Sequence, residues 1–320
     1  MLSDFPLQRH IPGASRLVLG CMGFGGGWDQ HGLSAEQVGH AQAAAEAALA
    51  AGITVFDHAD IYTLGKAEQA FGELFKAQPS LRDRMLLQSK CGIRFQEGDK
   101  PGRYDLSASY IERSVEASLQ RLHTDRLDLL LLHRPDPLIE PDEVAAAFGR
   151  LHSAGKVRYF GVSNMPAATL AWLQKHCSFP IVVNQVEMSL LAHDWLEAGT
   201  TFNDPQSLAP TRAPGWPELL AHCQQQGVQL QAWGALAKGQ LGEGSQHAAA
   251  ICLGRLAAQY EAPREAVLLA WLMRHPARIQ PVIGTTNPQR IADCASAMHI
   301  ELSRDDWYAL YVAARGRPLP

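Results

Sequence analysis

Four polar side chains capable of proton transfer follow short apolar segments of the sequence. Asp57 ends one such segment and Tyr62 follows it closely, while Lys90 and His133 end two further segments. Carboxylate, phenol, amine and imidazole groups are those that act as general acids and bases in enzymes. Each group alone is commonly structural, but four of them at the ends of successive segments predict one acid–base site.

Eight short apolar segments alternate with stretches of helical periodicity, and together they indicate how the four side chains are positioned. Near-continuous apolar strands are typical of a parallel sheet that is covered on both faces. We therefore predict a single-domain α/β fold, a (β/α)8 TIM barrel whose active site lies at the C-terminal face of the strands. The predicted strands are 16–20, 53–57, 85–90, 127–133, 157–162, 181–184, 228–233 and 279–283.

Capping residues and helical periodicity predict where the helices lie. Ser34 is expected to cap an alanine-rich helix that ends at Gly52, and Ser107 is expected to cap the helix before the fourth strand. Three more helices are predicted at 142–154, 216–226 and 288–298.

The barrel domain is expected to occupy residues 1–320, with an extension at each end. Residues 1–15 are predicted to form a plug or hairpin over the barrel bottom, and 303–320 to pack outside the barrel. The connections after Lys90 and Gln185 are long, and long loops without their own secondary structure are often functional. Both follow strands, so we expect them at the active-site face.

Composition limits the classes of partner. The 28 basic and 32 acidic residues give a formal net charge of −4, which argues against a nucleic-acid or anionic-membrane surface. No apolar run reaches the roughly 18 residues that span a bilayer. Charged residues and prolines interrupt the segment before Cys21, so a lipoprotein signal is not expected. The six cysteines form no C-x-x-C pair and are expected to be reduced thiols in a cytoplasmic protein.

Seven motifs occur in the order found in the aldo-keto reductases, and they cover nearly the whole chain. The sequence resembles that family, in particular the bacterial oxidoreductases related to potassium-channel β-subunits. The motifs are LGCMGFGG (19–26), FDHADIY (56–62), QSK (88–90), DRLDLLLLHRPD (125–136), GKVRYFGVSN (155–164), NQVE (184–187) and PVIGTTN (281–287).

The resemblance implies a catalytic tetrad of Asp57, Tyr62, Lys90 and His133. Hydride reduction of a carbonyl leaves an alkoxide that needs a proton, and Tyr62 would be its general acid. A free tyrosine has a pKa near 10, and a neighbouring cation lowers that pKa. Lys90 would be this cation, Asp57 would keep it charged, and His133 would hydrogen-bond the substrate carbonyl.

The resemblance also implies that a nicotinamide dinucleotide lies extended across the barrel top. The glycines at 23, 25, 26 and 27 do not form the G-x-G-x-x-G pattern of a Rossmann fold. Ser163, Asn164 and Gln185 would hold the carboxamide, and Trp233 would stack on the nicotinamide ring. The residues implied to bind the cofactor are Met22, Gly23, Ser163, Asn164, Gln185, Trp233, Gly234, Leu236, Lys238, Gly284, Thr285, Thr286 and Arg290.

Three departures from the family pattern concern the cofactor. Gly234 replaces a frequent serine, Gly284 replaces a lysine found in some members, and Cys294 replaces a frequent asparagine. Preference for NADPH over NADH is therefore expected to depend mainly on Arg290, whose guanidinium suits bidentate phosphate contacts.

The predicted reaction is NADPH-dependent reduction of a small aldehyde or ketone. Four residues are expected to line an apolar, aromatic substrate pocket: Phe24, Trp28, His58 and Trp195. No metal ion is predicted.

Two alternative functions would require different residues. A metal-dependent barrel hydrolase could use His58, Asp60, Lys90 and His133, but strands five to eight end in no histidine. A cofactor-binding redox sensor or regulator with weak reductase activity is compatible with an intact tetrad, and Cys21 and Cys91 are its candidate thiols.

Overall fold

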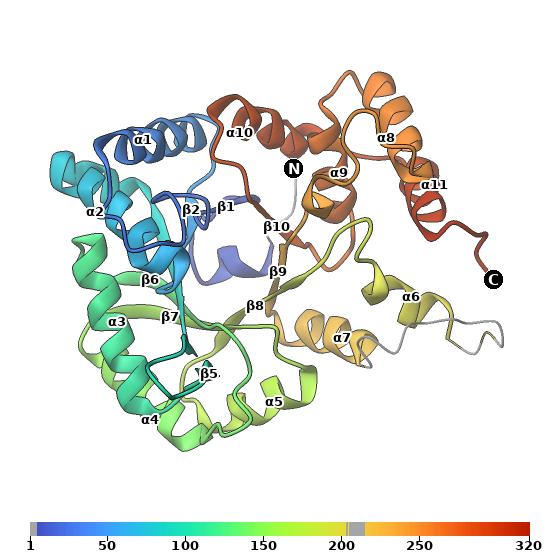
Figure 1. Cartoon of the computed structure of the whole chain (residues 1–320). Coiled ribbons are helices and arrows are strands. Elements are labelled where there is room, and N and C mark those ends of the chain that lie inside the picture. The colour runs from blue at the N-terminus through green and yellow to red at the C-terminus, as the bar shows by residue number, and fades with distance from the viewer. Residues whose placement is uncertain (1–4, 203, 205–214) are drawn as a thin grey trace.

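Eight parallel strands close into a barrel, as predicted. The structure of the chain, a computed structural model, describes residues 5–202, 204 and 215–320. Around the barrel the strands follow the order β1-β10-β9-β8-β7-β6-β3-β2, so each barrel strand pairs with its neighbours in sequence (Figure 1). The barrel strands are β1 (Val18–Gly20), β2 (Val55–Asp57), β3 (Leu86–Cys91), β6 (Leu127–Leu132), β7 (Val157–Ser163), β8 (Ile181–Glu187), β9 (Gln229–Trp233) and β10 (Gln280–Ile283).

Helices surround the barrel and cover the outer face of the strands (Figure 1). They are α1 (Ala35–Ala50), α2 (Lys66–Ala77), α3 (Ala108–Leu122), α4 (Pro141–Ser153), α5 (Ala167–His176), α6 (Asp194–Thr200), α7 (Trp216–Gln226), α8 (Ala248–Gln259), α9 (Arg264–Met273), α10 (Pro288–Ala295) and α11 (Arg304–Arg315). Among the described residues, no helix is long and apolar enough to cross a membrane.

The two predicted serine caps differ in outcome. Ser34 accepts a hydrogen bond from the Gln37 backbone, and the Gln37 side chain accepts one from the Ser34 backbone, which completes a capping box. Ser107 precedes α3 as predicted, but its side chain does not cap the helix. Its hydroxyl instead donates to Asp105 Oδ1 at 2.7 Å, because an acidic acceptor lies nearby in the loop.

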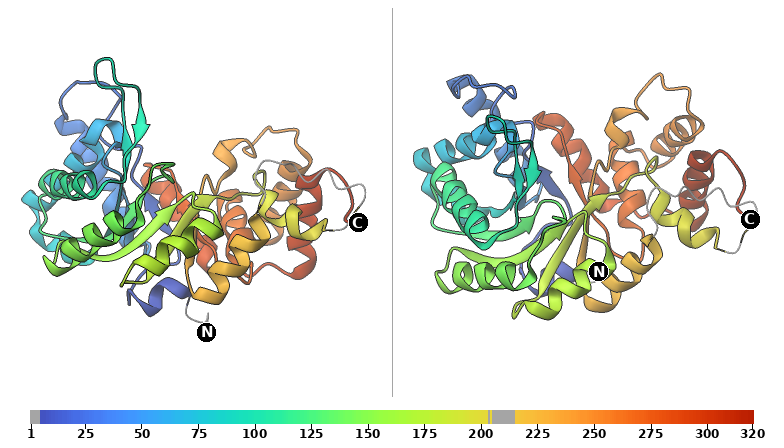
Figure 2. Two further views of the ribbon diagram at one scale, coloured as in Figure 1. Left: turned by 90° about the horizontal axis from the view of Figure 1, so that it is seen from below. Right: turned by 60° about the horizontal axis from the view of Figure 1, so that its bottom comes forward.

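The N-terminal segment closes the barrel bottom with a short 3-10 helix, η1 (Pro6–Arg9), and not with a hairpin. Phe5 and Leu7 are buried in a cluster with interior side chains of the strands, including Val55 and Leu131. Figure 2 (left) shows η1 on the side of the barrel opposite the active-site loops.

Both long connections contain secondary structure, contrary to the expectation of structureless loops. The connection after β3 forms an antiparallel hairpin of β4 (Ile93–Arg94) and β5 (Arg103–Tyr104), which projects from the barrel in Figure 2. Arg94 stabilises it through ion pairs with Glu97 and Asp105. The connection after β8 contains α6.

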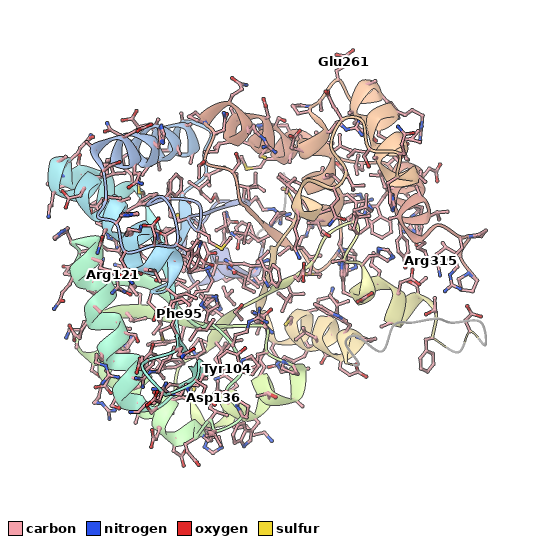
Figure 3. The ribbon with its side chains drawn as sticks, in the orientation of Figure 1. Phe95, Tyr104, Arg121, Asp136, Glu261 and Arg315 are labelled. Carbon is pink, nitrogen blue, oxygen red and sulfur yellow. The ribbon has the colours of Figure 1, made fainter. Side chains whose placement is uncertain are left out.

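The C-terminal extension packs outside the barrel as helix α11. Trp307 of α11 stacks on Trp271 of α9 with ring centroids 5.1 Å apart. Arg315, near the end of α11, pairs with the carboxylate of Glu197 on α6 (Figure 3). The extension therefore joins α9 to the connection after β8.

Candidate active site

Lys90 lies at the centre of a buried group of side chains at the C-terminal ends of β2 and β3. Its Nζ is 2.7 Å from Asp57 Oδ1 and 2.8 Å from Asp57 Oδ2. It also lies 2.9 Å from the Tyr62 hydroxyl and 3.0 Å from the His58 carbonyl oxygen. Lys90 is 1% exposed, so these acceptors replace its hydration. The ammonium group is thus held between the carboxylate and the phenol.

Burial and the neighbouring charges shift the pKa values of Tyr62 and Lys90 in opposite directions. Burial raises the pKa of Tyr62 above its usual value, and Lys90 offsets that rise only in part. Lys90 lowers the pKa of Tyr62 as expected, but burial outweighs this effect because the phenol is removed from water. Burial acts to lower the pKa of Lys90, but Asp57 and Tyr62 outweigh it and the pKa is raised. At neutral pH the site holds a protonated phenol beside a charged ammonium.

His133 follows β6 and faces the phenol. Its ring is perpendicular to that of Tyr62, with centroids 6.0 Å apart. Burial, together with the charges of Lys90 and Arg134, lowers the pKa of His133 to about 2. The imidazole is therefore neutral and carries one N–H donor and one acceptor. Its Nδ1 is buried without a partner within the described part of the chain.

The backbone immediately after Tyr62 has an unusual conformation, which the sequence analysis did not anticipate. Thr63, Leu64 and Gly65 all have positive φ angles, of 47°, 60° and 89°. Positive φ is uncommon outside glycine and is often found where a functional side chain is positioned. The Thr63 hydroxyl donates to the Phe24 carbonyl oxygen at 2.9 Å, which ties this turn to the loop after β1.

A cleft of about 1520 Å³ extends from the tetrad to the region between α8 and α10. That volume exceeds the roughly 300–1,000 Å³ typical of small-ligand pockets. Tyr62, Asp57 and His133 line one end of it. Of the thirteen residues predicted to bind the cofactor, all except Thr286 also line it: Met22, Gly23, Ser163, Asn164, Gln185, Trp233, Gly234, Leu236, Lys238, Gly284, Thr285 and Arg290.

Thr286 lies close to Gly23. A Cβ atom on Gly23 would lie 2.9 Å from Thr286 Cγ2, so a side chain at Gly23 would require the two loops to shift. Elsewhere on the cleft, Trp233, Asn164 and Ser163 are joined by side-chain hydrogen bonds. Trp233 Nε1 donates to Asn164 Oδ1 at 3.1 Å, and Asn164 Nδ2 donates to Ser163 Oγ at 2.9 Å.

These side chains fit a nicotinamide dinucleotide. Ser163, Asn164 and Gln185 offer amide and hydroxyl groups beside the indole of Trp233, as a carboxamide on an aromatic ring requires. Lys238 and Arg290 supply positive charge further along the cleft, where phosphate groups would lie. Each cation has an internal partner: Lys238 Nζ lies 2.8 Å from Glu187 Oε1, and Arg290 Nη2 lies 3.6 Å from Glu265 Oε1.

The predicted substrate residues do not all reach the cleft. Trp28 lines it and is 51% exposed. Phe24, His58 and Trp195 are buried instead and do not line it.

Aromatic packing explains the position of these three residues. Phe24 and His58 both pack on Phe71, at centroid distances of 5.4 and 4.6 Å. Burial lowers the pKa of His58 to about 3, so its imidazole stays neutral. Trp195 packs against Trp271 of α9 and against His275, and so belongs to the core beside α9 and not to the cleft.

Three residues in or near the tetrad end of the cleft were not predicted from the sequence. Ile61 and Arg134 line it, and each adjoins a tetrad residue in sequence. The guanidinium of Arg134 has no hydrogen-bond or ion-pair partner in residues 5–202, 204 and 215–320. Phe95 on the β4–β5 hairpin makes an edge contact with Trp28, with centroids 6.3 Å apart (Figure 3). Adjacency to Tyr62 and His133 was the available signal for the first two residues.

The cysteines and metal ligands that the two alternative functions would need can also be located in the structure. Cys21 and Cys91 are buried, and burial raises the pKa of each thiol well above its usual value. Both thiols therefore stay protonated, which disfavours a reactive sensor role. All six cysteines are unpaired. No group of three or more metal-ligating side chains occurs among the described residues.

Comparison with known proteins places the chain among characterised sequences and structures. The model of the Aldo/keto reductase family matches residues 16–313. A 6-dehydroglucose reductase of Agrobacterium fabrum is 40% identical over 282 residues, which cover 87% of this chain and 89% of that protein. Oxidoreductase YdhF of Escherichia coli is 38% identical over 273 residues, covering 84% and 85%. An aldo/keto reductase from Klebsiella pneumoniae in complex with NADP and acetate superposes with a TM-score of 0.72 at 27% identity, covering 96% and 93%.

Proposed function

The chain belongs to the aldo/keto reductase family, as its sequence motifs predicted, and is an NAD(P)H-dependent oxidoreductase. From this premise we propose that it reduces the carbonyl group of an aldehyde to an alcohol, with NADPH as the hydride donor and Tyr62 as the general acid. The observation that carries the proposal is the position of Lys90 Nζ between Asp57 and the Tyr62 hydroxyl.

The tetrad geometry supports a division of labour during reduction. The bound cofactor supplies the hydride. Tyr62 then gives its proton to the carbonyl oxygen, and the tyrosinate that remains lies 2.9 Å from the Lys90 ammonium. Because Lys90 stabilises this anion, proton loss from the partly desolvated phenol becomes feasible. The neutral His133 donates a hydrogen bond to the same oxygen and orients the substrate.

All but one of the residues proposed to hold the cofactor line the cleft. Ser163, Asn164 and Gln185 would bind the carboxamide, and Trp233 would stack on the ring. The loop from Gly234 to Lys238 would face the pyrophosphate, with Met22 and Gly23 opposite. Gly284, Thr285, Thr286 and Arg290 would surround the adenosine ribose and its 2′-phosphate.

Arg134 favours a hydroxylated substrate body over the purely apolar one expected from the sequence. Its guanidinium, which has no partner among the described residues, offers up to five N–H donors beside His133. Trp28 lines the cleft and makes an edge contact with Phe95, so an aromatic pair lies beside it. The Agrobacterium relative is named a 6-dehydroglucose reductase. We therefore propose a sugar-like aldehyde as the substrate class.

The proposal is tested by assaying the protein and its Tyr62→Phe variant with aldehydes of matched size, such as glyceraldehyde and propanal. NADPH consumption should be faster with the hydroxylated aldehyde. Tyr62→Phe should lower turnover by about 100-fold or more, since it removes the general acid. Binding of NADPH should be nearly unchanged.

Tyr110→Phe is the matched control. Tyr110 is half-buried on α3, and its hydroxyl donates to the Ile93 carbonyl oxygen and not to the tetrad. It should therefore retain most of the turnover. Substantial turnover by Tyr62→Phe would remove Tyr62 as the acid, and equal rates with both aldehydes would remove the proposed substrate class.

A further inference from the structure

Four glutamines from four barrel strands meet inside the barrel below the tetrad. Gln88 lies on β3, Gln185 on β8, Gln231 on β9 and Gln280 on β10. All four are at most 2% exposed. A buried amide that lacks hydrogen bonds is costly, so each must find partners within the barrel.

Gln231 is the centre of this network and uses both of its amide atoms. Its Oε1 accepts from Gln88 Nε2 at 2.9 Å and from Gln185 Nε2 at 3.0 Å. Its Nε2 donates to Gln88 Oε1 and to Gln280 Oε1, both at 3.0 Å. Gln231 thus makes four hydrogen bonds, the full number available to a primary amide.

The two ends of the network determine which way every amide faces. Gln88 Nε2 also lies 2.5 Å from Asp57 Oδ1, and a carboxylate paired with Lys90 can only accept. Gln280 Nε2 lies 2.6 Å from the Ser15 backbone carbonyl oxygen, which also can only accept. Each end independently requires Gln231 to turn its Nε2 toward Gln280 and its Oε1 toward Gln185.

This direction has a consequence for the side of Gln185 that faces the cleft. Gln185 Nε2 is committed to Gln231, while Gln185 Oε1 has no hydrogen-bond partner in the described part of the chain. Gln185 lines the cleft beside Ser163 and Trp233. Gln185 therefore presents its carbonyl oxygen as an acceptor to whatever occupies this position, while one N–H of its amide is held by Gln231.

We propose that the glutamine network locks the amide of Gln185 so that its carbonyl oxygen accepts an N–H from the carboxamide of the nicotinamide, with Gln231 as the positioning residue. The inference rests on the proposed function, since it takes a nicotinamide dinucleotide as the ligand of the cleft. It gives Gln231, which does not itself line the cleft, a role in positioning the side chain that binds the ligand.

The test compares two oxidised dinucleotides, NADP⁺ and its analogue with an acetyl group in place of the carboxamide. The analogue keeps the carbonyl oxygen but lacks the N–H. The wild-type protein should bind the analogue roughly three- to tenfold more weakly, as the loss of one hydrogen bond predicts. Quenching of tryptophan fluorescence measures both dissociation constants without turnover.

Gln231→Leu and Gln231→Met remove the acceptor of Gln185 Nε2 and free the amide to turn. In either variant the ratio of the two dissociation constants should fall toward one, because a turned Gln185 can donate to the carbonyl oxygen that both ligands share. The methionine variant is included because its flexible side chain fills an irregular core more readily.

Gln280→Leu is the matched control, since it makes the same change in the same core but leaves the Asp57 end of the network in place. It should keep the wild-type ratio. A merely structural role for Gln231 would weaken both ligands together and leave the ratio unchanged, which would overturn the inference. A wild-type ratio near one, or an equal fall in Gln280→Leu, would also overturn it. Failure of wild-type protein to bind either dinucleotide would instead refute the proposed function.

Discussion

At the scale of single residues, binding of a 2′-phosphate depends on the carboxylate that already pairs with Arg290. Arg290 is on the surface of the cleft, and its nearest carboxylate is Glu265 at 3.6 Å. A 2′-phosphate carries more negative charge than one carboxylate and accepts a bidentate contact from a guanidinium. A phosphate at this position would therefore displace Glu265 as the partner of Arg290.

We expect Arg290→Ala to raise the dissociation constant for NADPH roughly tenfold, because a charge-assisted contact is lost. NADH lacks the 2′-phosphate, so its dissociation constant should change little. Glu265→Gln removes the competing carboxylate and should slightly strengthen NADPH binding. Both constants can be measured by fluorescence titration, and equal weakening of NADPH and NADH in Arg290→Ala would contradict the assignment.

The types of the reacting residues could be predicted from the sequence, but their burial could not. Asp57, Lys90 and His133 end apolar strands, and that pattern was sufficient to bring them together. The net pKa direction of Tyr62 could not be predicted, because it depends on how far the phenol is removed from water. Trp195 was misplaced for the same kind of reason, since nothing local in the sequence separates a cleft aromatic from a core aromatic.

At the scale of elements, one ion pair joins the C-terminal helix to the connection after β8. The carboxylate of Glu197 on α6 pairs with Arg315 on α11 and accepts a hydrogen bond from the Tyr311 hydroxyl at 2.8 Å. The side chains of Arg315 and Glu197 are only 1% and 9% exposed. A buried pair is costly to break from one side, because the remaining charge stays desolvated.

Arg315→Gln should therefore lower the free energy of unfolding by about 3 kcal/mol. Amide hydrogen exchange should become faster in α6 and α11 together, while the barrel strands stay protected. Arg304→Gln changes an exposed arginine at the start of the same helix and should have little effect on either measurement. Faster exchange confined to α11 would show that the pair does not hold α6.

Elements with strong periodicity were predictable, and small polar ones were not. All eight barrel strands and helix α7 lie where the apolar pattern places them. The β4–β5 hairpin was missed because each strand has two residues and its stability comes from ion pairs of Arg94, which leave no apolar period to detect. The N-terminal plug was expected, but its form as η1 and not a hairpin depends on contacts with the barrel bottom.

At the scale of the whole molecule, buried titratable groups with shifted pKa values make the free energy of unfolding depend on pH. The pKa of His58 is lowered to about 3, that of His133 to about 2 and that of His275 to about 4, chiefly by burial. Near pH 5 the unfolded chain protonates these three histidines, whose unfolded pKa is about 6.5, and the folded chain does not. Burial raises the pKa of Asp60 to about 7, so the folded chain holds one proton there that the unfolded chain has lost.

Among these four groups, three protons favour the unfolded state and one favours the folded state. The lowered pKa of His10 acts in the same direction as those of the other histidines, so stability should fall as the pH drops from 7 to 5. Each excess proton contributes a slope of about 1.4 kcal/mol per pH unit. Urea unfolding at a series of pH values measures the slope. His275→Asn is the sharpest variant, because His275 Nδ1 accepts from the Ala277 backbone N–H at 3.2 Å and an asparagine oxygen can replace that acceptor without titrating. The variant should lose the share of the slope that one proton contributes. An unchanged slope would mean that His275 takes up its proton in the folded protein as readily as in the unfolded chain.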